Sequence, residues 1–341
     1  MGQLTSVIIV GGGLCGLSLA HALLAQGQDF QVLEGRDRIG GRVLTRDGLD
    51  LGPAWIWPGQ PRIEALLNQL DLTPFEQFST GDLLHEDAAG QVQRFRGRSG
   101  MEGALRVPGG LGAVATALAD RLPPDTVRTG CHVQRIETGS DMLRLDTSTG
   151  PIETERCVLT LPPRIAAGLL PDLAADTLAA LRAIPTWMAG HAKAVATYDQ
   201  PFWRDAGLSG DAFSRRGPMV EMHDASTPNG AAALFGFIGV PPAARRKGDA
   251  LQAAILKQFA HLFGPGAERP NALYLQDWAF DPFTATAADQ APLHAHPQYG
   301  PLPDPVPGRL LIAGTEMAQM HGGLVEGALE AAEAAFDRLT E

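Results

Sequence analysis

The stretch SVIIVGGGLCGLSLAHALLAQGQDFQVLE, residues 6–34, decides the fold. Residues 6–10 are a continuous β-branched run that ends at glycine, which predicts a buried strand. Residues 13–26 then predict a helix and residues 30–34 a second strand, so the whole stretch predicts one β-α-β unit. Gly11, Gly13 and Gly16 lie where strand turns into helix. Glycines there allow a tight turn and close approach of a pyrophosphate, which is held by N–H groups at the helix N-terminus.

An acidic residue supports this interpretation. Glu34 ends the second strand 18 residues after Gly16, where a carboxylate can accept hydrogen bonds from an adenosine ribose. A glycine turn without any ligand is the simpler alternative, but the strand, helix and acid together favour a dinucleotide. The motif alone does not separate a nicotinamide from a flavin dinucleotide.

Composition excludes several classes of protein. The chain has 341 residues, of which 45% are apolar and 19% charged, so it can bury a large core, and its length favours two domains. A formal net charge of −11 argues against nucleic acid and anionic membranes as partners.

Cysteine usage and hydropathy favour the cytoplasm. Cys15, Cys131 and Cys157 are odd in number, and their spacing fits neither a disulfide framework nor a metal site. The apolar run at 7–25 has no preceding Lys or Arg, so we do not expect a signal peptide. No later run is long enough to span a membrane.

The remaining pattern predicts an α/β fold of two interleaved domains. We expect strands at 132–137, 142–146, 156–161, 193–198, 218–222, 233–240, 272–280 and 309–314, and helices at 111–122, 244–263 and 323–339. The expected parallel-sheet nucleotide domain comprises 1–60, 106–182 and 284–341. The expected α+β substrate domain comprises 61–105 and 183–283.

The residues after Glu34 point to one kind of dinucleotide. Gly35-Arg-Asp-Arg-Ile-Gly-Gly-Arg42 resembles the signature of the large FAD-binding family that includes amine oxidases, phytoene desaturases and protoporphyrinogen oxidases. The resemblance implies FAD, with Arg36, Gly40, Gly41 and Arg42 near its diphosphate. An ordinary glycine loop is the alternative.

Four further stretches resemble the flavin monoamine oxidases, in the same order: LDLGPAWIWPGQPRI (49–63), RVPGGLGAVATALADRL (106–122), HVQRI (132–136) and AGTEMAQMHGGLVEGALEAAEAA (313–335). The first is similar to the loop along the flavin face, and the third to the segment that pairs with the adenine. The fourth is similar to the C-terminal flavin motif, in which a helix N-terminus faces the pyrimidine end of the flavin. The residues that this resemblance implies are Pro53, Ala54, Trp55, Val133, Gly314, Thr315, Glu316, Leu324 and Val325.

The middle of the chain also matches the family. HAKAVATYDQPFWR (191–204) resembles the segment with an active-site lysine, and Lys193 is the matching residue. Only three of the 27 basic residues are lysines, and a buried lysine shifts its pKa readily, which suits proton handling. A lysine that reaches solvent from the end of the strand is the alternative. LQDWAFDPFTATAADQ (275–290) resembles the segment that brings a tryptophan, here Trp278, to the flavin.

Three departures from the family pattern shape the expected site. Ala287 stands where some members attach the flavin through cysteine, which predicts non-covalent FAD. Ala288 and Leu324 stand where monoamine oxidases carry two aromatic rings around the amine. Trp55, Trp57 and Phe283 are the candidates for an aromatic wall in place of these rings, and Ala288 and His321 are further candidate lining residues. The segment 61–105 is shorter than the corresponding insertion of the larger family members. Three alternatives therefore stay open: an open cleft, a small roof, or a lid from a second copy of the chain.

The pattern as a whole predicts a flavin oxidase acting on the C–N bond of a small amine. The amine, O₂ and water would give an aldehyde, ammonia and H₂O₂, with Lys193 as the catalytic side chain. Two alternatives stay open: a desaturase or oxidase acting on C–C bonds of a hydrophobic substrate, and a non-catalytic FAD-binding protein. We expect no metal, because HAH at 294–296 is the only close pair of histidines.

Overall fold

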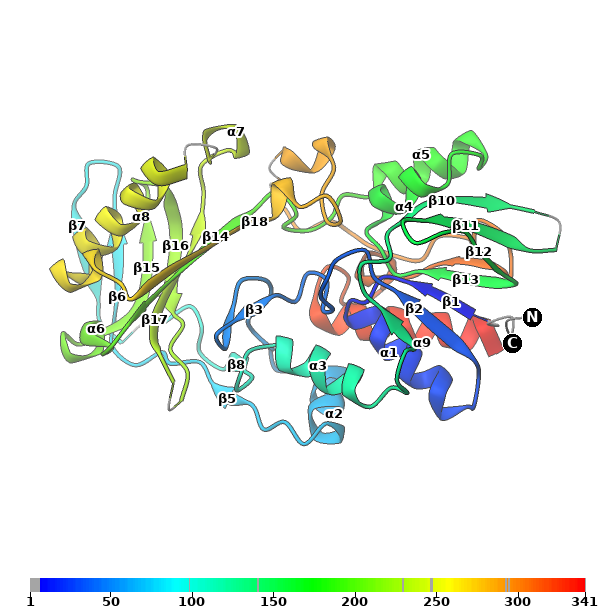
Figure 1. Ribbon diagram of the computed structural model, residues 1–341. Helices are drawn as coiled ribbons and strands as arrows, with labels where there is room; N and C mark the ends of the chain where they lie inside the picture. The colour runs from blue at the N-terminus through cyan, green and yellow to red at the C-terminus, as the bar shows by residue number, and fades with distance from the viewer. Residues whose placement is uncertain are drawn as a thin grey trace.

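The computed structural model describes residues 7–97, 99–139, 141–228, 230–245, 248–291, 293 and 295–340. Two sheets dominate the molecule and lie at its opposite ends (Figure 1). The α/β fold class expected from the sequence is confirmed, because a parallel sheet with helices stands beside a second, largely antiparallel sheet.

The first sheet is parallel and has the strand order β19-β13-β1-β2-β9. Its strands are β1 (Val7–Val10), β2 (Phe30–Leu33), β9 (Val127–Arg128), β13 (Arg156–Leu159) and β19 (Leu310–Ile312). The expected β-α-β unit is β1, α1 (Leu14–Ala25) and β2. Side chains alternate along β1: Val7 and Ile9 face one core cluster, and Ile8 and Val10 face another.

Different elements cover the two faces of this sheet. The face of Ile9 packs on four helices: α1, α2 (Pro61–Gln69), α3 (Gly112–Asp120) and α9 (Val325–Thr340). The face of Ile8 packs on a small antiparallel sheet and two short helices. These elements are β10 (Val133–Thr138), β11 (Leu143–Thr147), β12 (Ile152–Thr154), α4 (Pro163–Leu169) and α5 (Ala175–Ala183). A sheet covered on both faces explains why its strands are continuous apolar runs.

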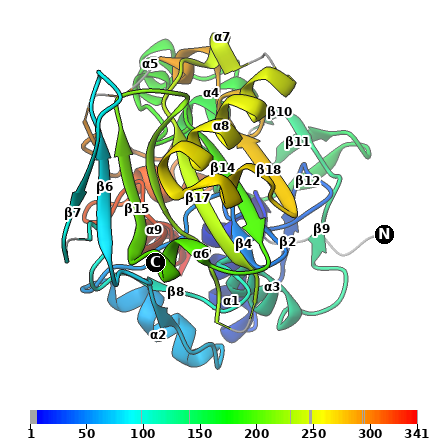
Figure 2. The ribbon, with the colours of Figure 1, turned by 90° about the vertical axis from the view of Figure 1, so that its left-hand side faces the viewer.

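The second sheet has seven strands in the order β18-β14-β17-β16-β15-β6-β7. They are β6 (Asp82–Glu86), β7 (Val92–Phe95), β14 (Ala192–Tyr198), β15 (Leu208–Ser214), β16 (Met219–Asp224), β17 (Ala232–Ile238) and β18 (Ala272–Asp277). Helix α8 (Gly248–Phe263) covers its outer face (Figures 1 and 2). Ala194 of β14 and Phe259 of α8 belong to the same core cluster there. Along β14, Lys193 and Val195 alternate with Ala192, Ala194 and Ala196. The side chains of Lys193 and Val195 therefore point to the inner face of the sheet, toward the first sheet.

The remaining elements are short. They are β3 (Thr45–Arg46), β4 (Leu49–Asp50), β5 (Phe75–Glu76), β8 (Leu105–Arg106), α6 (Phe202–Asp205), α7 (Pro242–Arg245), η1 (Pro265–Glu268), η2 (Trp278–Phe280), η3 (Ala287–Gln290) and η4 (Thr315–Met317). A core cluster of Leu49, Leu51, Val195, Phe235 and Trp278 spans the junction between the loop after β4 and the inner face of the second sheet.

Two expectations differ from the structure. The strand expected at 272–280 ends at Asp277, because the Asp277 carboxylate accepts a hydrogen bond from the Ala279 N–H and starts a 3-10 turn. Helix α2 opens the segment 61–105, which we assigned to the substrate domain, yet Ile63 and Leu67 lie in the core beside α1 and α9. The remaining domain boundaries stay a prediction.

Candidate active site

The two glycine turns expected at the nucleotide site lie against each other. Gly40 donates its N–H to the carbonyl of Gly12 at 2.8 Å, and Gly13 and Gly40 form a parallel bridge. A Cβ on Gly41 would lie 3.2 Å from the Cα of Gly13, and a Cβ on Gly16 only 2.0 Å from the carbonyl oxygen of Gly11. These close approaches require glycine at both turns.

This arrangement fits a dinucleotide. Gly13 caps α1 without a side-chain hydrogen bond, and the first turn of α1 has no acidic residue. A Cβ on Gly13 would have no neighbour closer than 3.9 Å, so there is room beside the N-terminus of the helix. The positive end of the helix macrodipole and its N–H groups therefore lie at a glycine-lined space, which suits a phosphate.

Glu34 is held in place by backbone N–H groups. Its carboxylate accepts hydrogen bonds from Gly12 N at 2.8 Å and from Arg36 N at 2.9 Å. Arg36 also lies 3.5 Å from Glu34 and bonds to Asp281 at 2.5 Å. Because each carboxylate oxygen has a second lone pair, Glu34 keeps acceptor capacity for a ribose. Val133 lies nearby on the strand after Cys131, whose N–H donates to the Glu34 carbonyl.

Phe283 lies at this nucleotide end. A Cβ on Gly35 would be 2.5 Å from the Phe283 ring, which also meets the His132 ring at 5.0 Å and the Arg36 guanidinium at 4.9 Å. The structure therefore does not bring Phe283 to Lys193, where we expected it as a lining residue. The Phe283 ring occupies the space that the missing side chain of Gly35 leaves.

Arg42 joins the second glycine turn to the C-terminal motif. Its guanidinium binds both carboxylate oxygens of Glu316, at 2.5 and 3.1 Å, and the Glu316 side chain is 0% exposed. Thr315 donates its hydroxyl to the carbonyl of Leu324 at 2.7 Å, which ties η4 to the start of α9. Gly314 has a φ of 124°, a conformation that favours glycine. Glu316 is thus engaged by Arg42, and Val325 begins α9 as expected.

Two side chains, Lys193 on β14 and Trp278 on η2, anchor the loop 49–57, which we expected along the flavin face. Trp278 Nε1 donates to the carbonyl of Leu51 at 3.0 Å. Lys193 Nζ donates to the carbonyl of Gly52 at 2.5 Å and lies 3.5 Å from that of Asp50. Pro53 and Ala54 follow directly. Lys193 and Trp278, which the family resemblance assigned to the flavin site, therefore both contact this loop.

Lys193 lies in an apolar environment and is 4% exposed. Its Nζ is 4.6 Å from the ring centroid of Phe235, 5.4 Å from Phe237 and 5.5 Å from Trp55. Burial lowers the pKa of Lys193 to about 7, against the opposing effect of Asp50 and with a further lowering by Arg106. The amine therefore changes charge near neutral pH and can take up or release a proton there.

Asp50 is a second buried ionisable group that sequence reasoning missed. Its Oδ1 accepts hydrogen bonds from Thr45 Oγ1 at 2.6 Å and Leu111 N at 2.9 Å, whereas its Oδ2 is buried without a hydrogen-bond partner. Burial raises the pKa of Asp50, and the Thr45 bond and Lys193 oppose that rise. Its place in the stretch LDLG, before the expected flavin-face loop, was the available signal.

Four further residues expected at the site, three as lining residues and Leu324 as a cofactor residue, lie partly or fully at the surface. Ala288 and Leu324 are exposed, and neither carries an aromatic ring. Trp57 is 38% exposed, and its backbone N–H donates to Gln60. His321 is half-buried, with Nδ1 3.9 Å from Glu330. His294 and Lys247 lie outside the described residues, among which no group of three His, Cys, Asp or Glu is placed to hold a metal ion.

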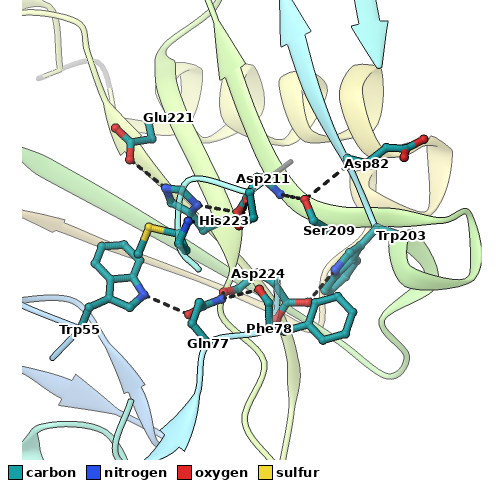
Figure 3. A network of polar contacts seen from close by, with 12 residues as sticks. Trp55, Gln77, Phe78, Asp82, Trp203, Ser209, Asp211, Glu221, His223 and Asp224 are labelled. Carbon is teal, nitrogen blue, oxygen red and sulfur yellow. Dashed lines mark hydrogen bonds and ion pairs between the residues drawn. The ribbon is translucent and has the colours of Figure 1, made fainter. Parts of the chain in front are cut away.

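A polar network behind Trp55 was not expected from the sequence (Figure 3). His223 is buried between two carboxylates, with Nδ1 2.7 Å from Asp211 and Nε2 2.8 Å from Glu221. Burial alone would lower the pKa of His223, but its bonds to these carboxylates outweigh burial and raise it. Trp55 Nε1 donates to Gln77 Oε1 at 3.0 Å. These polar residues are far apart in sequence, so no local pattern marks them.

A dinucleotide-binding sheet that faces a buried lysine across a shared loop defines a flavin-dependent oxidoreductase. Residues 14–96 and 84–339 match the family model for flavin containing amine oxidoreductases. The chain belongs to this family.

Known proteins align with almost the whole length of this chain. It is 26% identical, over an alignment 441 positions long, to a Mycobacterium tuberculosis protein that bears the name of a flavin-containing monoamine oxidase, AofH; the alignment covers 96% of this chain and 95% of the relative. Among solved structures, the cyclohexylamine oxidase of Brevibacterium oxydans superposes with a TM-score of 0.84 at 19% identity and 99% coverage of both chains. A putrescine oxidase solved with putrescine bound superposes at 0.82 and 20% identity, covering 98% of this chain and 99% of the other. No helix among the described residues is long and apolar enough to cross a membrane.

Proposed function

We propose that this protein oxidises a small amine with O₂ and water to an aldehyde, ammonia and H₂O₂, using FAD that is not covalently attached. The single observation that carries this proposal is Lys193, a buried lysine directed at the loop that the family places along the flavin. A titrating amine in an apolar, aromatic environment is a feature that an FAD-binding scaffold would not need. Membership of an amine oxidoreductase family favours a C–N bond over a C–C bond.

The residues that would hold the cofactor form one continuous path. The glycines at 11, 13, 16, 40 and 41 surround the N-terminus of α1, and Arg42 stands beside them, paired with Glu316. Glu34 would accept the adenosine ribose, and the N-terminal turn of α9 at Leu324 and Val325 would face the far end of the cofactor. When bound, the flavin supplies the acceptor for a hydride equivalent from the carbon next to the amine nitrogen.

The chain's own residues control protons and water. Above about pH 7 the Lys193 amine is neutral and can accept a proton. Its contact with the Gly52 carbonyl fixes the position of Nζ, so the proton is held at one defined atom. The rings of Trp55, Phe235 and Phe237 surround Nζ and exclude water from it.

Attachment of the flavin can be tested together with activity. Ala287 offers no nucleophile, so acid precipitation should release all yellow colour into the supernatant; colour in the pellet would overturn non-covalent binding. The purified protein should then be mixed anaerobically with a panel of amines. Bleaching by one class of amine, followed by H₂O₂ on admission of air, is the expected result. A flavin that no amine bleaches would refute amine oxidation.

A further inference from the structure

We propose that Gln77 is a positioning residue that fixes the Trp55 indole against Lys193, so that Trp55 and Phe237 supply the aromatic wall that Ala288 and Leu324 do not provide. This inference rests on the proposed amine oxidation, because it assigns the surface against which the amine would lie. It also concerns the segment 61–105, to which the sequence assigned no site residue.

The hydrogen bonds of Gln77 determine the orientation of its side chain. Its Nε2 donates to the carbonyl of Asp224 at 2.8 Å and to that of Phe78 at 3.1 Å. Two carbonyls can accept only from the amide nitrogen, so Oε1 must face the other way, toward the Trp55 N–H at 3.0 Å. Gln77 is 4% exposed, so water does not compete readily for these bonds.

The Trp55 indole is confined by rings on its other edges. His223 meets it edge-on, with centroids 5.4 Å apart at 79° (Figure 3). The ring centroids of Phe235 and Phe237 lie 5.2 and 6.4 Å from that of Trp55. His223 is itself fixed by Asp211 and Glu221. The packing limits how far the indole can tilt, and the Gln77 bond selects the orientation in which its face meets Lys193.

The two rings of this wall lie at the same level of the second sheet as Lys193. Lys193 pairs with Phe237 across β14 and β17, so both side chains point to the inner face at the same level of the sheet. Trp55 reaches this level from the loop 49–57. A neutral amine next to Lys193 would therefore meet two aromatic faces, which attract a developing positive charge on nitrogen.

The test compares Gln77→Met with Gln258→Met. Gln258 is a similarly buried glutamine that also accepts one N–H and donates to two carbonyls, but it belongs to α8, which covers the opposite face of the sheet. Both variants should lose similar stability toward urea. Only Gln77→Met should lower kcat/KM for the amine, by roughly tenfold, as expected for a lost buried hydrogen bond.

Coupling with Trp55 separates positioning from a purely structural role. Trp55→Phe keeps a ring but removes the N–H, so it should lower kcat/KM as Gln77→Met does, and the double variant should be no worse than either. Multiplying effects in the double variant, or equal activity of the two glutamine variants, would overturn the proposal. If Gln77→Met does not fold, an unimpaired Trp55→Phe alone overturns it.

A spectroscopic measurement works without any amine. The near-ultraviolet circular dichroism of the holoenzyme minus that of Trp55→Phe isolates the Trp55 signal. The same difference, taken in the Gln77→Met background, should lose most of its intensity; an unchanged signal would show that Gln77 does not hold the indole. A wild-type flavin that no amine reduces would refute the proposed function, and this measurement would still decide the role of Gln77.

Discussion

Replacing Lys193 by methionine should change how the stability of the protein depends on pH. The pKa of Lys193 is lowered from an ordinary 10.5 to about 7 in the folded protein. Between these values the unfolded chain binds one proton more than the folded chain, so the contribution of Lys193 to stability rises with pH. Integrated from about pH 7 to about pH 9, this rise is about 2 kcal/mol. Methionine removes the titration, so this rise should be absent from the variant.

The assay is urea unfolding of the holoenzyme with excess FAD at several pH values. Wild type minus Lys193→Met should change by about 2 kcal/mol over this range. Loss of the bond to Gly52 shifts the whole curve by about 1–3 kcal/mol but does not change its slope. Lys257→Met, on the exposed side of α8, is the matched control and should run parallel to wild type. A difference between wild type and Lys193→Met that stays constant with pH would refute a buried, titrating amine.

Three further predictions concern the cofactor path. Arg42→Met leaves the Glu316 carboxylate buried and unpaired, so the free energy of unfolding measured with urea should fall by about 3–5 kcal/mol, and flavin should be released. An unchanged free energy of unfolding would contradict a buried ion pair. Gly16→Ala forces a Cβ onto a backbone carbonyl, and calorimetry should show FAD affinity lower by about tenfold or more, whereas Gly168→Ala, with open space around it, should bind normally. Trp278→Phe loses one indole hydrogen bond, so its free energy of unfolding should be lower by about 1 kcal/mol. An unchanged free energy of unfolding would show that this bond does not hold the loop 49–57.

Local patterns in the sequence predicted the nucleotide end of the molecule well. The β-α-β unit of β1, α1 and β2 is short and contiguous, and its periodicity is undisturbed by distant contacts. Lys193 was singled out because the segment 191–204 resembles the family's lysine segment and because lysines are few in this chain; its catalytic role stays a prediction. These features depend on residues close together in the chain.

Other features depend on distant partners and were missed. Strand β15 contains Gly210 and the buried Asp211, so its sequence lacks the apolar pattern that predicts a strand. Hydrogen bonds from Ser99 and His223 offset the cost of burying the Asp211 carboxylate. Gln77 resembles any polar residue of a connecting segment until Asp224 and Trp55 are placed beside it. Phe283 was misplaced for the same reason, since only the fold reveals the space over Gly35.

The order of strands in the first sheet bears on how the chain folds during synthesis. β19 and α9 come from the last part of the chain, yet β19 completes the sheet beside β13, and α9 packs against α1 near the beginning. The first sheet therefore cannot close until the residues of β19 and α9 have left the ribosome. The second sheet draws all its strands from 82–277 and can pair earlier. We expect FAD to be captured only after α9 has been synthesised and has packed against α1.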